Sequence, residues 1–243
     1  MIFHIVWKLL LALIVFILDV LCAIIILCDK VFRHAVPFLL IVTILLLDAL
    51  SLLTIIIYDA PSQIIGRPLF GDPYTAVIVL ITSVVWFMEL LLLPTLALTH
   101  YSALCWPMWF RRLNVKHVII LLLILLLVSL ALTAPLFTPC CGFKFYVPGF
   151  YWSFDEEKPG TPIYNQFNLY LQAFALGTML LFDFAIVYNL AMLKRKKFIS
   201  EGVTFVRTAK VYIDIVAICP TLATLMYSRR DFLLTEVVMS GKV

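Results

Sequence analysis

The sequence predicts an all-α fold, a polytopic membrane helix bundle with about six transmembrane helices. Of the 243 residues, 64% are hydrophobic and only 13% are charged, and the mean hydropathy is +1.11. A soluble domain is roughly half apolar, and its surface needs many polar groups to remain monomeric. A chain of this composition therefore folds in lipid rather than in water.

Segment length gives the number of helices. About 20 apolar residues cross a hydrocarbon layer of about 30 Å, because each helical residue rises about 1.5 Å and every amide must bond within the segment. The first apolar segment is about twice as long as a signal-peptide core and no cleavage pattern follows it, so it is predicted to stay as an anchor. Six segments meet or approach the required length: 5–28, 35–58, 75–99, 118–137, 168–193 and, more weakly, 211–228.

Polar or turn-forming residues set the boundaries between these segments. The predicted connections are 29–34, 59–74 with several prolines and glycines, 100–117, 138–167 and 194–210. Pro135 ends the fourth helix, and Pro94 and Pro220 are expected to bend the third and sixth because each removes a backbone hydrogen bond. The sequence shows no repeat and no separate soluble domain, so residues 1–243 are predicted to form a single transmembrane domain.

The distribution of lysine and arginine predicts the orientation, because such charges remain on the cytoplasmic side during insertion. The first, third and fifth connections carry eleven of them, whereas the second and fourth carry Arg67, Lys144 and Lys158. Acidic residues 155–157 offset the last two. The amino terminus is therefore expected outside, and after six crossings the tail from Arg229 is expected outside as well. Arg229 and Arg230 in that tail weigh against a sixth full crossing.

Two local sequences resemble a known family. Residues 100–113, HYSALCWPMWFRRL, follow the third helix and look like the receptor segment in which an acid, an arginine and an aromatic precede a small residue, proline and a basic stop. Residues 139–146, PCCGFKFY, followed by YWSF at 151–154, resemble the second outer loop of nematode serpentine chemoreceptors, most closely class X. The resemblance implies a seven-helix-receptor-like bundle in the plasma membrane that senses a small external ligand.

The departures from that family carry expectations of their own. His100 and Tyr101 stand where these receptors usually carry an arginine that engages the G protein. The apolar run 232–239 is too short for a seventh helix, so the chain is expected to lack it. The outer-loop cysteines Cys140 and Cys141 find no cysteine in segment 72–83, so the disulfide that receptors commonly form with the third helix is not expected within this chain.

Five carboxylates fall inside predicted helices, where charged groups are costly and usually face protein or trapped water. Asp19, Asp48 and Glu89 each lie roughly 20 Å along their helices, near the bilayer midplane. One interpretation is a shared cation or proton site; the other is a set of neutral acids hydrogen-bonded to neighbouring helices. Asp183 is in the fifth predicted helix, and Asp214 lies near the inner end of the sixth.

The aromatic outer loop 143–154 and its acidic triplet suggest a lid. Aromatic rings offer stacking surfaces to an organic ligand, and carboxylates attract a cation; anchoring of the rings at the headgroup layer is the alternative. The candidate ligand-binding residues are Glu89, Trp152 and Asp183. The candidate cytoplasmic coupling residues are His100, Tyr101, Arg111, Arg112, Lys194 and Arg195, and for the basic run 194–197 a purely topogenic charge is the alternative.

No nucleophile elbow, phosphate loop or zinc motif is present, so an enzyme, a cofactor, a catalytic residue and a metal site are not expected. The expected partners are membrane lipid, a heterotrimeric G protein, an unknown small-molecule ligand and a partner receptor, with no nucleic acid. Two rival hypotheses remain open. One is a small channel or transporter that uses the intramembrane carboxylates, and the other is an inactive, truncated receptor relative.

Overall fold

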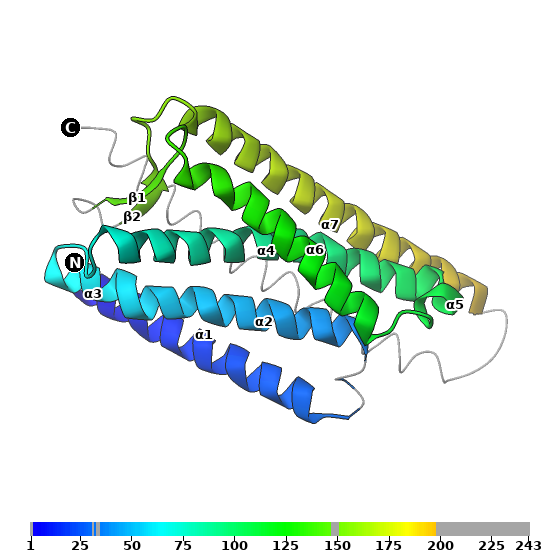
Figure 1. Ribbon diagram of the computed structural model, residues 1–243. Coiled ribbons are helices and arrows are strands. Elements are labelled where there is room, and N and C mark those ends of the chain that lie inside the picture. The colour runs from blue at the N-terminus through cyan, green and yellow to red at the C-terminus, as the bar shows by residue number, and fades with distance from the viewer. Residues whose placement is uncertain (1, 31, 33–34, 147–150, 198–243) are drawn as a thin grey trace. The chain divides into compact units, whose positions relative to one another are not determined.

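Long helices account for most of the chain (Figure 1). The computed structural model describes residues 2–30, 32, 35–146 and 151–197. The predicted segment 211–228, with Asp214 and Pro220, lies outside them. The elements are α1 (Ile2–Cys28), α2 (Val36–Thr54), the π-helix η2 (Ile55–Asp59), α3 (Ala60–Ile65), α4 (Asp72–Cys105), α5 (Pro107–Phe110), α6 (Val115–Thr133), the 3-10 helix η3 (Ala134–Phe137), β1 (Phe143–Tyr146), β2 (Tyr151–Phe154) and α7 (Thr161–Lys197).

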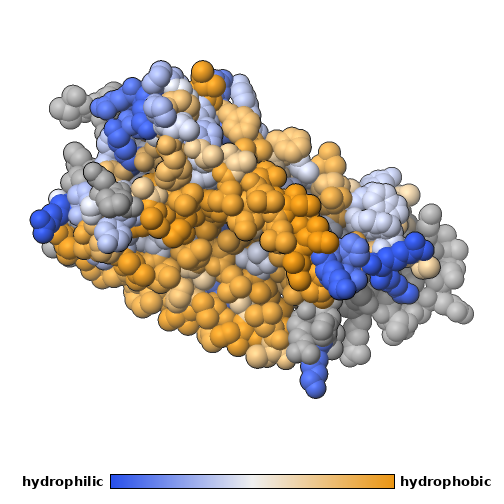
Figure 2. Space-filling view, viewed as in Figure 1, coloured by the Kyte–Doolittle hydropathy of each residue, from blue (hydrophilic) through white to orange (hydrophobic). Residues whose placement is uncertain are grey.

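Five helical stretches of the described chain are long and apolar enough to cross a membrane. They are Ile5–Cys28, Val36–Ile65, Tyr74–Cys105, Val115–Phe137 and Thr161–Met192, and they contain between 23 and 32 residues. On the face shown in Figure 2, hydrophobic side chains form a broad band with hydrophilic residues near its ends. Leucine and isoleucine exposed along α1 and α6 are the side chains that lipid would cover. The polytopic membrane helix bundle predicted from the sequence is therefore confirmed.

The chain divides into two units, residues 1–186 and 187–243. In the first unit α1 packs on α2, α2 on α4, and α4 on α6. The helices α2 and α4 bury a larger share of their residues than α1, α6 or α7. The first part of α7 joins the unit through side chains, for example the Tyr164 hydroxyl, which donates to the Leu132 carbonyl at 2.7 Å. The described part of the second unit is the remainder of α7, up to Lys197.

The second membrane helix continues past residue 58, where the sequence predicts a connection. A π-helical turn, η2, precedes Pro61 in the first turn of α3, and it lies where the proline removes one backbone hydrogen bond of the continuing helix. The widened turn buries three consecutive residues, Tyr58, Asp59 and Ala60. The helix finally ends at Gly66, whose φ of 75° is a left-handed conformation that glycine adopts without strain.

The predicted outer loop contains a β-hairpin. Its antiparallel strands β1 and β2 pair Phe143 with Phe154 and Phe145 with Trp152. Because side chains alternate along a strand and paired residues share a face, these four aromatic residues lie on one face of the hairpin. Phe143 and Phe154 pack against a buried cluster of the helix bundle that includes Phe87, Leu136, Cys141 and Tyr164. We call this end of the first unit the hairpin end and the end that carries α5 the α5 end.

Candidate functional site

The hairpin is attached to the π-helical turn by an aromatic cluster and one hydrogen bond. The indole N–H of Trp152 donates to Asp59 Oδ1 at 2.9 Å. The ring of Trp152 lies 5.7 Å from that of Tyr58 and 5.0 Å from that of Phe145. Tyr58, only 1% exposed, also places its hydroxyl 3.2 Å from Thr75 Oγ1 of α4. The hairpin, α2 with its π turn, and α4 therefore meet around Tyr58.

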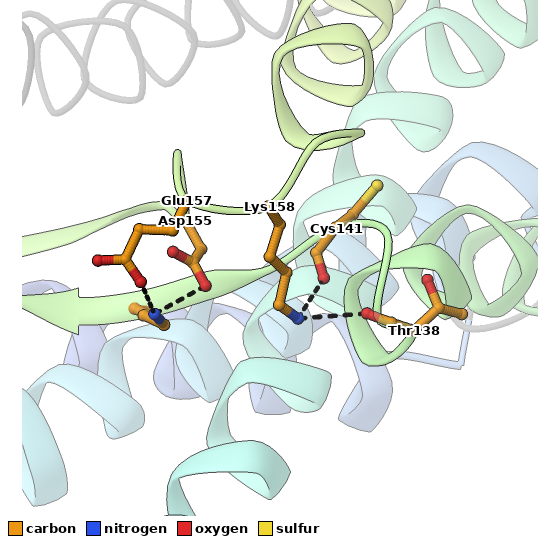
Figure 3. Close-up of polar contacts among 6 residues, drawn as sticks. Thr138, Cys141, Asp155, Glu157 and Lys158 are labelled. Atoms are coloured by element: carbon orange, nitrogen blue, oxygen red, sulfur yellow. Dashed lines mark hydrogen bonds and ion pairs between the residues drawn. The ribbon is translucent and has the colours of Figure 1, made fainter.

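Two lysines hold the base of the hairpin (Figure 3). The ammonium of Lys144 lies 2.8 Å from Asp155 Oδ2 and 3.3 Å from Glu157 Oε2. The ammonium of Lys158 donates to the carbonyl oxygens of Cys141 at 2.7 Å and Thr138 at 3.2 Å. Two of the three carboxylates in the acidic triplet are therefore paired with a lysine of β1, which removes much of the negative rim expected from the sequence.

The Lys144–Asp155 pair makes the attachment of the hairpin dependent on pH. The hydrogen bond from Lys144 lowers the pKa of Asp155 below its ordinary value of 3.8, and the same bond raises the pKa of Lys144 above its ordinary value of 10.5. Because the pKa of the Asp155 carboxyl is lower in the folded protein than in the unfolded chain, the carboxylate's stabilising contribution is complete above pH 3.8. That contribution is lost as the pH falls through the lower pKa of the folded state. The contribution of Lys144 is complete below pH 10.5 and is lost at higher pH.

We expect Asp155→Asn to increase hydrogen exchange of residues 151–158 severalfold at neutral pH, because it removes the ion pair between the buried Asp155 carboxylate and Lys144. The backbone amide of Asp155, which donates to the Gly142 carbonyl at 2.9 Å, should then exchange faster. Mass spectrometry at several pH values, corrected for intrinsic exchange, measures the difference from the wild type. That difference should disappear when the pH falls well below 3.8. Glu157→Gln is the control, since its side chain is 87% exposed and such pairs contribute little. Equal effects of the two variants would contradict this account.

A second polar group lies between α4 and α7. Trp86 Nε1 of α4 donates to Asn168 Oδ1 of α7 at 3.4 Å. Farther along, the rings of Tyr101 and Phe182 lie 5.6 Å apart. Fifteen residues separate Trp86 from Tyr101 and fourteen separate Asn168 from Phe182, so the two helices run in the same direction and in step.

This register brings two further buried side chains to one depth. Glu89 follows Trp86 by one turn and is 4% exposed, and Gln172 follows Asn168 by one turn and is 8% exposed. Neither Nε2 nor Oε1 of Gln172 has a hydrogen-bond partner among the described residues. We call Trp86, Glu89, Asn168 and Gln172 the interior polar group.

The three carboxylates of the predicted cation site are all buried. Asp19, Asp48 and Glu89 are 5%, 8% and 4% exposed. Asp19 of α1 and Asp48 of α2 lie close enough to interact electrostatically, and Asp19 Oδ2 accepts no hydrogen bond from the described residues. Within the described chain, no three His, Cys, Asp or Glu side chains are arranged to hold a metal ion, so Glu89 does not join the two aspartates in such a group.

The α5 end carries four of the residues predicted to couple to a cytoplasmic partner, His100, Tyr101, Arg111 and Arg112. His100 is buried, and the ring of Tyr101 lies 5.8 Å from that of Trp106. Arg111 and Arg112 are exposed directly after α5. A cavity of about 710 Å³ is lined by Leu98, Ser102, Cys105, Trp106, Pro107, Met108 and Trp109. Lys194 and Arg195 belong to the second unit, as part of α7, and their side chains lie outside the described structure.

The predicted ligand residues do not come together at one depth. Trp152 lies at the level of Tyr58 and Thr75, whereas Glu89 follows Thr75 by fourteen residues, or roughly 21 Å along the helix. Asp183 is half-buried and follows Phe182, which contacts Tyr101 near the α5 end. The structure therefore separates Trp152, Glu89 and Asp183 along the bundle.

Several residues around the hairpin and in the interior polar group were not predicted from the sequence. Asp59 and Tyr58 were placed at the boundary of a predicted connection, and Arg67 entered only as a charge. Asn168 and Gln172 carry a signal that was available, because two amides four residues apart on an apolar helix share a face. Asp59 had no such signal, because its burial depends on the π turn.

Comparisons with known proteins agree with the arrangement of the helices. The family model described as serpentine type 7TM GPCR chemoreceptor Srx matches residues 10–211. The crystal structure of squid rhodopsin is similar with a TM-score of 0.68 and 14% sequence identity, which shows the fold. The match covers 79% of this chain, and the chain spans about half, 53%, of the rhodopsin chain. No curated protein sequence matches. Because the family model covers most of its length, the chain belongs to the Srx family of serpentine seven-transmembrane G-protein-coupled chemoreceptors.

Proposed function

We propose that this chain binds a small external ligand at the hairpin end and signals to a heterotrimeric G protein at the α5 end. The observation that carries the proposal is a cavity of about 730 Å³ between the hairpin, the π turn and the start of α4. Its volume lies in the range of small-molecule sites, and aromatic residues predominate in such sites. The hairpin end is outside in this proposal, as the distribution of basic residues predicts.

Signal transfer is assigned to the interior polar group. The helix α4 contributes Thr75 to the cavity, Glu89 to the interior polar group, and Tyr101 near the α5 end. A ligand that favours one packing of α4 against α7 shifts the population of that packing along the whole helix pair. Glu89 and Gln172 are buried polar groups whose interactions depend on this packing.

The coupling surface is assigned to α5 and the residues around it. Trp106, Met108 and Trp109 expose 55%, 75% and 55% of their surfaces, and Arg111 and Arg112 follow them. Aromatic residues, methionine and arginine are enriched in protein interfaces. A G protein docking here would meet an apolar surface with a basic margin.

Two variants at opposite ends test the proposal. The chain in lipid nanodiscs is screened against a small-molecule library by thermal shift, and stabilising compounds are then tested for nucleotide exchange on a mixture of purified G proteins. Phe145→Leu at the hairpin end should remove both stabilisation and exchange. Trp109→Ala at the α5 end should remove exchange and preserve stabilisation. A compound that stabilises both variants fully and stimulates exchange in both would overturn the proposal.

A small channel or transporter is the second candidate, because Asp19 and Asp48 interact electrostatically inside the bundle. In this alternative the two carboxyls relay a cation or a proton. The chain reconstituted in liposomes would then carry a sodium or proton flux without any ligand, and Asp48→Asn would abolish it. A tight liposome with no flux above that of empty vesicles would exclude this candidate.

A further inference from the structure

The cavity at the hairpin end is lined by aromatic rings and by two cationic side chains. Its walls include Tyr58, Phe70, Thr75, Phe145, Arg67 and Lys144. Among the residues whose side chains the structure describes, no aspartate or glutamate lines it. The rings provide an apolar surface, and the two cationic side chains are the charged groups among the lining residues that the structure describes.

The wall that carries Arg67 is fixed by its own contacts. Gly66 ends α3 in a left-handed conformation, with a φ of 75°, and turns the chain back. The amide of Leu69 then donates to the buried Ser62 Oγ at 3.1 Å. The ring of Phe70 lies 6.0 Å from that of Tyr58. Arg67 is therefore presented by a short segment that is tied to the helix at both ends.

The two cations differ in their availability. Lys144 is engaged by Asp155 and Glu157, at 2.8 and 3.3 Å. Arg67 has no hydrogen bond or ion pair with any residue in the described part of the chain. A guanidinium presents a planar set of donors that matches a carboxylate in a two-point contact. Arg67 is thus the cation that a bound anion would meet.

We propose that this cavity binds an organic anion with an apolar body, the anionic group at Arg67 and the body against Phe70 and Phe145. The inference rests on the proposed function, since it names the chemical class of ligand for the same cavity. A cationic ligand of the same shape is disfavoured, because the Arg67 guanidinium repels it, whereas the charge of Lys144 is offset by Asp155 and Glu157. Neutral ligands lose the contact with Arg67.

Three probes of one shape and different charge test the class of ligand. They are 4-phenylbutyrate, its neutral amide 4-phenylbutanamide and the cation 4-phenylbutylamine. Binding to the full chain in phosphatidylcholine nanodiscs is measured by ligand-observed NMR, with empty nanodiscs subtracted for partition into lipid. We expect the anion to bind about tenfold more tightly than the amide, as for a hydrogen-bonded charged group, and the amine to bind most weakly.

Substitutions then locate the contact. Arg67→Gln should reduce the affinity of the anion to that of the amide, and Arg67→Lys should preserve part of the preference. Lys116→Gln, at an exposed lysine of α6 far from the cavity, is the control and should leave the affinities of all three probes unchanged. Equal affinity of anion and amide in the wild type, a preference that survives Arg67→Gln, or no binding of any probe would overturn the assignment to anions.

A further variant separates this inference from the proposed function. If the probes bind without preference for charge and Phe145→Leu abolishes their binding, the cavity is the ligand site and only the anionic class is wrong. If Phe145→Leu leaves the binding of all three probes unchanged, the probes bind elsewhere, and the cavity fails as the ligand site as well.

Discussion

Gly160→Ala is expected to destabilise the protein by about 1–3 kcal/mol, the usual cost of forcing extra atoms into a packed site. A Cβ atom at Gly160 would lie 2.8 Å from the carbonyl oxygen of Cys140 and 3.0 Å from its sulfur. The Gly160 amide also donates to that carbonyl at 2.9 Å, so neither backbone can move away without losing the bond. The close approach joins the start of α7 to the segment before β1.

Thermal unfolding in nanodiscs measures this effect, and Gly177→Ala is the matched control. Gly177 lies within α7, the helix that begins directly after Gly160, and a Cβ there meets no atom within 4 Å. Alanine favours a helix interior over glycine by roughly 0.5–1 kcal/mol, so this control should be neutral or slightly stabilising. Equal stability of the two variants would show that the contact between Gly160 and Cys140 is not formed.

Gln172→Leu is expected to stabilise the protein by roughly 1–3 kcal/mol. Gln172 is 8% exposed and neither polar atom of its side chain has a partner among the described residues. A buried amide without hydrogen bonds costs about that much, and leucine of similar size removes the cost. Signal transfer is assigned to the interior polar group, which includes Gln172, so the same change should weaken the response to a ligand. Functional groups are often kept at the expense of stability.

Thermal unfolding also measures this prediction, with Gln166→Leu as the control. Gln166 lies on the same helix and is exposed, and its Nε2 donates to the Tyr170 hydroxyl at 3.0 Å. Its replacement should change stability by no more than about 0.5 kcal/mol. Destabilisation by Gln172→Leu would instead show that the amide has a partner in the folded protein.

The membrane fold was predictable because it depends on quantities that add along the chain. Helix length and apolar content alone identify α1 and α6 to within four residues at each end. The predicted end of the third helix was wrong, because α4 continues to Cys105, six residues past Thr99, and includes His100 and Tyr101. The continuation of the second membrane helix to Ile65 was not predictable, because Asp59 and Pro61 are typical of the start of a connection. The helix continues through this point by forming a π turn, and the π turn depends on the packing around the buried Tyr58.

The candidate site was predictable only in part. Trp152 was singled out for its aromatic surroundings, but its hydrogen bond to Asp59 joins residues 93 apart in the sequence. The acidic triplet suggested a negative rim, and the pairing of Lys144 with Asp155 depends on the strand register. Such contacts between distant segments are set by the fold, and no local pattern contains them.

The side of the membrane that the hairpin faces tests the central claim most directly. An epitope at the amino terminus and, in a second variant, an epitope after Lys197 are probed with antibodies on intact and on permeabilised cells. The account predicts that the amino-terminal epitope is accessible on intact cells and that the epitope after Lys197 is accessible only after permeabilisation. The opposite pattern would place the hairpin cavity inside the cell and contradict a receptor for an external ligand.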